Sequence, residues 1–352
     1  MTTPDTIKSD KVIWGLLGKN RGDSSQVEVL CQALGKEFGV EPVFKKLTCI
    51  KRFVVPNIFR RPSLNILSKA DKQKLAPEWP DIIVGSGRKT VAVARWVKQQ
   101  SGNKTKLVWI GRPKAPLEWF DLAITTPQYG LPEGPNIYQL PLPLVPHKTV
   151  VSALHRWQDL PRPWIGVLVG GARFPVQMDD HCIGQLGHCI TAACEASGGT
   201  ALVSTSPRTG RETGEKLQSL VPSGSDFYLW QKDGENPYQA ILSNADRFIV
   251  TGDSASMMGE ACHMGKPVEV FPLQRSSLWP RWGASNGFIA WLIAKGVLAP
   301  PRDISAIHDL LLERGLADVY GRKNRNGQVE EGCYNQDTEL SVIVARVGKF
   351  MS

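Results

Sequence analysis

Short apolar runs alternate with longer amphipathic segments along most of the chain. Residues 12–17 are apolar and predict a strand, and a glycine-bearing loop follows at residues 18–23. Apolar residues then recur at helical spacing over residues 24–34. We expect Asp23 or Ser24 to cap this helix, because both side chains accept hydrogen bonds from backbone N–H groups. The pattern therefore predicts a strand–loop–helix unit.

The same unit recurs along the chain. Further strands are predicted at residues 81–84, 106–110, 122–125, 164–169, 200–205, 248–251 and 267–271. Further helices are predicted at residues 91–100, 180–196, 208–220 and 258–264. Strands that alternate with helices of this length are typical of a parallel, doubly wound α/β sheet.

A proline-rich stretch at residues 140–148 lacks periodicity and is interpreted as an interdomain linker. It separates a predicted N-terminal domain, residues 10–147, from a C-terminal domain, residues 148–315. Residues 316–352 form a predicted tail. Its last segment, 339–351, carries apolar residues on one helical face, so we expect that helix to dock on a domain.

Composition places the chain among globular proteins. Of its 352 residues, 42% are hydrophobic and 21% are charged, which excludes a disordered, collagenous or fibrous chain. The net charge of +9 suits nucleic acid, an anionic membrane or a phosphorylated small molecule. There is no signal peptide pattern, no apolar stretch of roughly 18 residues, and no Cys-x-x-Cys pair among seven cysteines. We expect a cytoplasmic protein, at most peripheral at a membrane.

Four glycine-bearing loops follow predicted strands, and each is expected to precede a helix: 18–23, 85–90, 170–174 and 251–257. Ligands of open parallel sheets bind at the carboxyl ends of the strands, and helix N-termini suit phosphate. The alternative is that the glycines only make tight turns between strands and helices. Four such loops in two domains favour a ligand site.

The loop at residues 251–257 is the most informative of the four. Ser254 and Ser256 place hydroxyls beside the N–H groups of the coming helix, which suits a phosphate. Glu260 lies about one turn into that helix and is able to accept two hydrogen bonds from a ribose diol. The alternative is a surface glutamate that follows two capping serines.

Several familiar sites are not supported. Residues 85–90 lack the order of a Walker A loop, no Gly-x-Gly-x-x-Gly follows a strand, and there is no Gly-x-Ser-x-Gly. Histidines and cysteines cluster on the helix at residues 180–196, where their spacing favours helix packing over metal binding. We therefore predict no metal site and no cofactor.

A set of motifs resembles one protein family. The motifs are GENPY at 234–238, NAD at 244–246, VTGDSASMMGEA at 250–261, GKPV at 265–268 and FPL at 271–273. Residues 85–90, 170–171, 205–206 and 208–209 also fit. The chain is similar to mitochondrial fission proteins of the plant "elongated mitochondria" type and their bacterial relatives. It departs from the family at residues 172–175, where the usual aromatic-rich ending is Ala-Arg-Phe-Pro.

That family resembles GT-B glycosyltransferases such as the peptidoglycan N-acetylglucosaminyltransferase. The resemblance implies two Rossmann-like domains with an interdomain cleft, a nucleoside-diphosphate sugar as ligand, and no bound metal. It implies that Glu260 binds the ribose and that Asn236 and Tyr238 lie near the base or sugar. The implied diphosphate contacts are Ser254, Ser256, the Met257 N–H, Gly171 and Arg173.

The resemblance assigns the acceptor side to the N-terminal domain. The acceptor-side loop residues are Asn20, Arg21, Gly22, Gly87 and Arg88. Asp23 is the best-placed carboxylate to deprotonate an acceptor hydroxyl. A purely capping role for Asp23 is the alternative.

A basic and apolar segment at residues 44–61 contains no acidic residue. This combination suits an anionic membrane surface, and lipid-acceptor GT-B enzymes have similar patches. The alternative is a solvated loop over a core strand. No nucleic-acid recognition motif is present, so we expect no nucleic-acid partner. The membrane patch is predicted to contain Lys45, Lys46, Lys51, Arg52, Phe53, Phe59, Arg60 and Arg61.

The leading hypothesis is a GT-B-like glycosyltransferase that transfers a sugar from a nucleoside-diphosphate donor, with a lipid-linked molecule as one candidate acceptor. Two alternatives stay open: a nucleotide-sugar epimerase, and a non-catalytic membrane-associated adaptor of the mitochondrial-fission type. The sequence does not define the base, the sugar, the acceptor or the oligomeric state.

Overall fold

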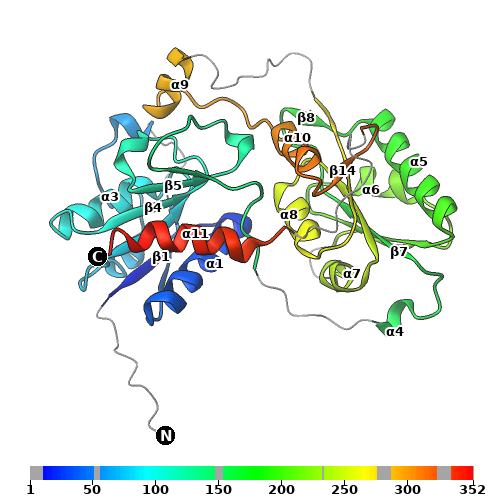
Figure 1. Ribbon diagram of the computed structural model, residues 1–352, viewed down its shortest axis with the longest axis horizontal. Helices are drawn as coiled ribbons and strands as arrows, with labels where there is room; N and C mark the ends of the chain where they lie inside the picture. The colour runs from blue at the N-terminus through cyan, green and yellow to red at the C-terminus, as the bar shows by residue number, and fades with distance from the viewer. Residues whose placement is uncertain are drawn as a thin grey trace, which may run out of the picture. The chain divides into compact units, whose positions relative to one another are not determined.

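The computed structural model describes residues 11–50, 56–146, 154–231, 234–275, 287–322 and 334–351. The chain forms two compact units (Figure 1). Unit 1 comprises residues 1–147, 282–301 and 336–352, and unit 2 comprises residues 148–281 and 302–335. Each unit is therefore built from segments that are far apart in the sequence.

Unit 1 contains a six-stranded parallel sheet with the order β2-β1-β3-β4-β5-β6. The strands are β1 (Ile13–Leu17), β2 (Val43–Lys46), β3 (Ile82–Ser86), β4 (Lys106–Ile110), β5 (Leu122–Thr125) and β6 (Ile137–Gln139). The helices are α1 (Arg21–Phe38), α2 (Lys69–Gln73), α3 (Val91–Gln100), α9 (Gly287–Ala294) and α11 (Gln336–Gly348), with short 3-10 turns η1 (Asn57–Phe59), η2 (Leu117–Trp119) and η3 (Pro127–Tyr129).

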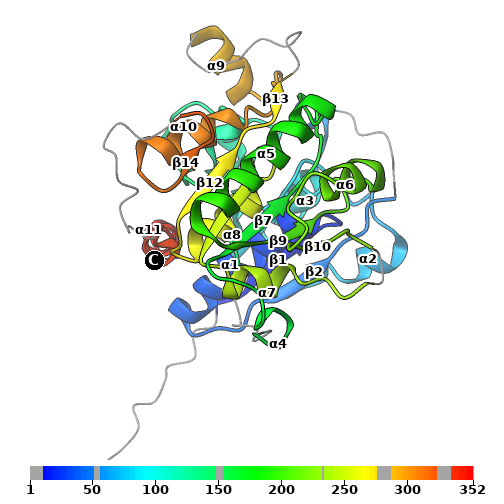
Figure 2. The ribbon, with the colours of Figure 1, turned by 90° about the vertical axis from the view of Figure 1, so that its right-hand side faces the viewer.

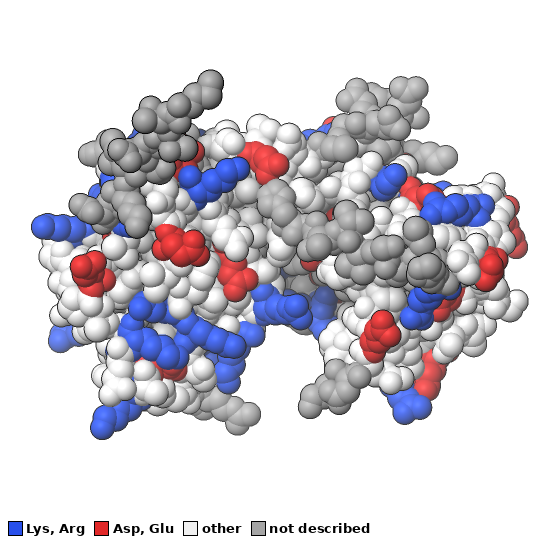
Figure 3. Space-filling model, turned by 90° about the horizontal axis from the view of Figure 1, so that it is seen from below, with Lys and Arg blue, Asp and Glu red and all other residues white. Residues whose placement is uncertain are grey.

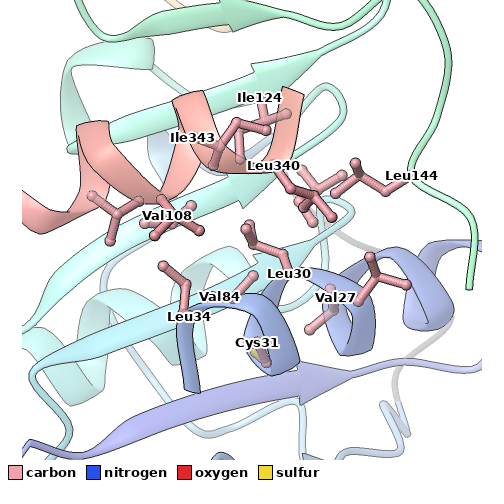
Figure 4. Packing of buried hydrophobic residues seen from close by; sticks show 14 of the residues in the cluster. Val27, Leu30, Cys31, Leu34, Val84, Val108, Ile124, Leu144, Leu340 and Ile343 are labelled. Carbon is pink, nitrogen blue, oxygen red and sulfur yellow. The ribbon is translucent and has the colours of Figure 1, made fainter. Parts of the chain in front are cut away.

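Two hydrophobic clusters cover the opposite faces of this sheet. Ile13 packs in the cluster formed with α1 and α11, whereas its neighbour Trp14 packs in the cluster formed with α3. This alternation follows from the two-residue period of a strand. Figure 4 shows Leu30 of α1 and Ile343 of α11 in the first cluster. The predicted C-terminal helix, α11, therefore docks on the sheet that contains β1, the first strand of the chain.

Unit 2 contains a second six-stranded parallel sheet, with the order β10-β9-β7-β11-β12-β14. Its strands are β7 (Trp164–Val169), β9 (Thr200–Thr205), β10 (Asp226–Tyr228), β11 (Arg247–Thr251), β12 (Val268–Phe271) and β14 (Asp318–Val319). β8 (Val176–Gln177) and β13 (Gln274–Arg275) form an antiparallel pair. The helices are α4 (Leu154–Trp157), α5 (Asp180–Ser197), α6 (Arg211–Gln218), α7 (Tyr238–Asn244), α8 (Ala255–His263) and α10 (Ser305–Glu313).

Helices cover both faces of the second sheet, with α5 on one face, toward the viewer in Figure 2, and α7 on the other. Ile165 and Val167 pack with α5, whereas Gly166 between them faces Ile241 of α7. The buried apolar sequence of β7 is typical of a strand that is covered on both faces. Cys182, Cys189 and Cys194 belong to the α5 cluster, as the packing interpretation predicts.

The start of α1 differs from the prediction. The helix begins at Arg21, its N-cap is Asn20, and neither Asp23 nor Ser24 caps it. The Ser24 N–H already donates to the Asn20 carbonyl oxygen at 3.0 Å, so the chain is helical from Arg21 onward. Asp23 is therefore an acidic residue in the first turn of α1, where a negative charge is favourable.

Candidate functional site

The strand order of each sheet reverses beside its first strand. In unit 1 the chain runs from β1 to β2 and then crosses to β3, and in unit 2 it runs through β7, β9 and β10 before it crosses to β11. The carboxyl ends of strands at such a switch point are the usual place for a ligand in open α/β sheets. Both candidate sites lie at these positions.

In unit 1, the carboxyl ends of β1, β2 and β3 surround a pocket of about 340 Å³. We call it the unit 1 pocket. It is lined by Gly18, Lys19, Asn20, Asp23, Leu47, Cys49, Ser86, Gly87, Arg88, Lys89 and Thr90. Of the predicted acceptor-side loop residues, Asn20, Gly87 and Arg88 therefore lie together, and the predicted catalytic residue Asp23 lines the same pocket. Arg21 and Gly22 are exposed on the first turn of α1, outside this lining.

Hydrogen bonds fix the loop at residues 85–90, which forms one wall of the unit 1 pocket. Gly87 has a φ of +70°, which a residue without a Cβ adopts readily. The Thr90 hydroxyl donates to the Ser86 carbonyl oxygen at 2.7 Å. The buried Asn57 side chain donates to the Arg88 carbonyl oxygen at 2.9 Å. The loop is therefore anchored at both of its ends and in the middle.

Lys89 belongs to the loop at residues 85–90 that was predicted to bind a ligand, whereas sequence reasoning did not single out Lys19 or Cys49 as pocket residues. Burial raises the pKa of the Cys49 thiol, whereas the nearby Lys89, Arg60 and Lys19 charges oppose that rise. Arg60 thus lies close to the pocket, although it was assigned to the membrane patch. The position of Lys19 in the glycine-bearing loop at residues 18–23 was a signal for it, but nothing local in the sequence indicated Cys49.

The predicted membrane patch is described only in part, because Lys51, Arg52 and Phe53 lie outside the described residues. Phe59 is 76% exposed, and Lys46 and Arg61 are exposed as well. Lys45 is half-buried and stacks its ammonium group over the Trp14 ring at 4.5 Å. Lys and Arg side chains gather on unit 1 on the face that Figure 3 shows at left. No helix within the described ranges has both the length and the apolar character to span a membrane.

In unit 2, Asp253 organises the loops that follow β7, β9 and β11. Its carboxylate accepts from the Gly171 N–H at 3.0 Å and from the Thr251 hydroxyl at 2.8 Å. It also pairs with the Arg208 guanidinium at 2.8 Å, and its side chain is fully buried. Burial raises the pKa of Asp253, and Arg208 is the largest opposing influence. One carboxylate therefore ties three loops together.

The Gly170–Gly171 turn fits tightly among these groups. A Cβ on Gly170 would lie 2.3 Å from the Asp253 carboxylate oxygens, and one on Gly171 would lie 2.2 Å from the Arg208 carbonyl oxygen. The Ser206 hydroxyl donates to the Gly170 carbonyl oxygen at 2.9 Å. Sequence reasoning included Gly171 but missed Arg208 and Asp253 as site residues. Both stand inside the motifs that carry the family resemblance.

The loop at 170–174 leads into β8 rather than directly into a helix, so the expectation of a helix N-terminus there is wrong. Arg173 is exposed, and its carbonyl oxygen accepts from the Val176 N–H at 3.0 Å in a short turn. Arg173 and Val176 form an antiparallel β-bridge, and this bridge fixes the turn in place of a helix. Arg173 therefore offers a cation at this loop without a helix dipole.

The start of α8 has the geometry of a capped helix. Ser254 is the N-cap, and its hydroxyl oxygen accepts from the Met257 N–H at 3.5 Å. The Met257 N–H, which the family resemblance assigned to the diphosphate, therefore already donates to Ser254. The Ser254 hydroxyl keeps its own proton to donate. Ser256 and Met257 are half-buried in the first turn of α8.

Glu260 is half-buried, and the phenol of Tyr238 at the start of α7 donates a hydrogen bond to its carboxylate. Burial and the adjacent Glu260 carboxylate raise the pKa of Tyr238 well above its usual value. Asn236 is exposed, and its side-chain oxygen accepts from the Tyr238 N–H at 2.9 Å. The structure thus joins Asn236, Tyr238 and Glu260 in one chain of contacts.

A family model described as mitochondrial fission ELM1 matches residues 21–303. The chain belongs to the mitochondrial fission ELM1 family. The mitochondrial fission protein ELM1 of Arabidopsis thaliana is 24% identical over 235 residues, which cover 56% of this chain and 53% of that protein. The uncharacterized protein RP120 of Rickettsia prowazekii is 22% identical over 303 residues, which cover 74% of this chain and 82% of that protein. The match thus spans about half of the Arabidopsis protein.

The ELM1-family chain also shares its fold with a solved structure. This is a protein of Listeria monocytogenes provisionally assigned as a UDP-N-acetylglucosamine 2-epimerase, with a TM-score of 0.51 and 14% identity. The match covers 96% of each chain. The predicted fold class, an α/β protein with two Rossmann-like domains of the GT-B kind, is confirmed.

Proposed function

We propose that this ELM1-family chain is a glycosyltransferase that binds a nucleoside-diphosphate sugar at unit 2 and transfers the sugar to an acceptor bound by unit 1. The observation that carries the proposal is the loop cluster around Asp253, which lies at the switch point of its sheet beside the capped start of α8. Glu260 supplies a carboxylate one turn further along the same helix.

The donor contacts follow from this geometry. The Ser254 and Ser256 hydroxyls donate to the diphosphate, and the positive end of α8 stabilises its charge. Glu260 accepts hydrogen bonds from the ribose hydroxyls, and Tyr238 holds the carboxylate in place through its phenol. Arg173 adds a positive charge on the exposed loop after β7.

The transfer step uses Asp23 as general base. The acceptor hydroxyl gives its proton to the Asp23 carboxylate, and its oxygen forms a bond to the anomeric carbon of the sugar. The bond between that carbon and the diphosphate oxygen breaks, and the nucleoside diphosphate leaves with the bonding electrons. Asn20 donates to Asp23 at 3.0 Å and orients it.

Calorimetric titration with UDP, GDP, CDP and ADP tests the donor site. The fold shared with a provisionally assigned UDP-sugar enzyme makes UDP the first probe. Glu260→Gln is expected to weaken nucleotide binding by about tenfold or more, because hydrogen bonds to a charged group contribute about 1.5–3 kcal/mol. Glu195→Gln on the exposed side of α5 is the matched control and leaves binding unchanged. Equal affinity for wild type and Glu260→Gln would remove the ribose role.

Product analysis separates the transferase from the two alternatives. A transferase releases nucleoside diphosphate only when an acceptor is present. An epimerase interconverts the donor sugar without any acceptor. A membrane-associated adaptor of the fission type binds none of the four nucleotides. The shared fold favours the epimerase alternative, and family membership favours the adaptor.

The membrane patch is a separate part of the proposal. Exposed Phe59 lies close to exposed basic residues, and basic plus apolar side chains together suit an anionic bilayer surface. Sedimentation with anionic vesicles is expected to fall for Phe59→Ser. Leu220→Ser, a variant of an exposed leucine in unit 2, keeps full sedimentation. Absence of vesicle binding by wild type would refute this part of the proposal.

A further inference from the structure

The unit 1 pocket carries an excess of positive charge. Its lining contains Lys19, Arg88 and Lys89, whereas Asp23 is the only carboxylate among the lining residues that the structure describes. Arg60 adds a fourth cation near Cys49. Like charges around one small cavity repel each other, so this arrangement costs free energy unless an anion is bound.

Two helices begin at the unit 1 pocket. Asn20 is the N-cap of α1 and Thr90 is the N-cap of α3, and both residues line the cavity. Neither side chain caps its own helix: the Asn20 amide donates to Asp23, and the Thr90 hydroxyl donates to the Ser86 carbonyl oxygen. Within the described part of the chain, neither N-cap side chain occupies the first-turn N–H groups of its helix, and the dipoles of both helices favour an anion.

The size of the unit 1 pocket and the groups that line it favour a phosphate over other anions. A cavity of about 340 Å³ holds a small group rather than a polymer strand. The N-termini of α1 and α3 and the side chains of Lys19, Arg88 and Lys89 line this cavity. This many donors suit the several acceptor oxygens of a phosphate better than the two oxygens of a carboxylate. Buried Asn57 fixes the Arg88 backbone, so this wall is preformed.

We infer that the unit 1 pocket binds the phosphate or diphosphate group of a second molecule, which is the acceptor if the proposed transfer function holds. Lys19, Arg88 and Lys89 contact the phosphate oxygens. Asp23 lines the same cavity, where it meets the acceptor hydroxyl and repels the anion. The acceptor class is therefore a phosphorylated molecule.

Titration with inorganic pyrophosphate tests the anion site directly. Arg88→Gln and Lys89→Gln are each expected to weaken pyrophosphate binding about tenfold or more. Asp23→Asn is expected to tighten it several-fold, because the variant removes a repelling charge without changing size. Lys36→Gln, in the exposed last turn of α1, is the control and leaves binding unchanged. Unaltered binding by Arg88→Gln and Lys89→Gln, or weaker binding by Asp23→Asn, would overturn the inference.

Cys49 provides an internal reporter, since its half-buried thiol lines the unit 1 pocket. Alkylation of Cys49 at mildly alkaline pH, read by peptide mass spectrometry, is expected to slow when pyrophosphate is bound. Vesicles of phosphatidylcholine with and without phosphatidic acid form a second arm. Protection by pyrophosphate assigns a soluble phosphate, and protection only by phosphatidic acid vesicles assigns a lipid-borne phosphate. Protection by neither overturns the inference.

Glu260→Gln separates this inference from the proposed donor site. The variant is expected to lose nucleotide binding while pyrophosphate still protects Cys49. If UDP protects Cys49 in wild type but not in Glu260→Gln, the pocket belongs to the donor and the second-molecule inference is wrong. If no nucleotide binds wild type but pyrophosphate protects Cys49, the donor proposal fails and the anion site stands.

Discussion

Removal of the Arg208 charge is expected to give a pH-dependent loss of stability. Arg208→Gln leaves the fully buried Asp253 carboxylate without its counter-ion, although the Gly171 N–H and the Thr251 hydroxyl still donate to it. Breaking a buried ion pair on one side costs about 3–5 kcal/mol. The Arg208 side chain is 35% exposed, so water replaces part of the interaction, and we expect about 2–3 kcal/mol at neutral pH.

The pH dependence follows from the direction of the Asp253 pKa. Burial already raises this pKa above the usual 3.8, and loss of Arg208 raises it further. A carboxyl group with a raised folded-state pKa stabilises the fold at low pH and loses that contribution as pH rises. The cost of Arg208→Gln should therefore shrink as pH falls and Asp253 becomes protonated.

Thermal unfolding at about pH 4.5 and about pH 7.5 measures this effect. The double variant Arg208→Gln/Asp253→Asn should recover part of the lost stability at neutral pH, because both charges are then absent. Arg211→Gln is the control, since its partner Glu215 is largely exposed, and no measurable change is expected. Equal losses for Arg208→Gln at both pH values, together with no recovery in the double variant, would refute the reasoning.

Three further predictions concern packing and protonation. Gly171→Ala forces a Cβ against the Arg208 backbone and should lower stability by about 1–3 kcal/mol, whereas Gly184→Ala in open space on α5 should be neutral or stabilising; calorimetry compares the two. Ile343→Ala should cost about 2–5 kcal/mol in chemical denaturation, because this side chain of α11 is fully buried. Burial lowers the pKa of His308, so wild-type stability should fall as pH drops below about 6.5; His308→Gln should flatten that part of the pH profile in thermal unfolding.

Much of the fold could be predicted from local pattern, because the central strands of both sheets are short apolar runs and most helices have an apolar face. The edge strands β2, β6, β10 and β14 were not predicted, because they are short and carry polar residues. The start of α1 could not, since its first turn contains polar residues and a glycine. Its position depends on the backbone bond between Ser24 and Asn20. The sequence also shows the apolar face of α11 but not which sheet that face covers.

The candidate sites were predictable to the extent that glycines and serines mark loops after strands. The loops after β1, β3, β7 and β11 are found this way. The pairing of Arg208 with Asp253 was not predictable, because it depends on β9 and β11 flanking β7 in the sheet. The Tyr238 contact with Glu260 likewise joins two helices that only the fold brings together.

The position of α11 has a consequence for the order of synthesis. The Gln336 side chain exchanges two hydrogen bonds with the Val145 backbone, and α11 closes the cluster that contains Ile13. A ribosome therefore makes every strand of unit 1 long before it makes the helix that covers them. Until translation reaches α11, that side of the sheet lacks part of its cover and is a surface for chaperones to bind. Unit 1, although its sheet is made first, is the part of this protein whose core is completed last.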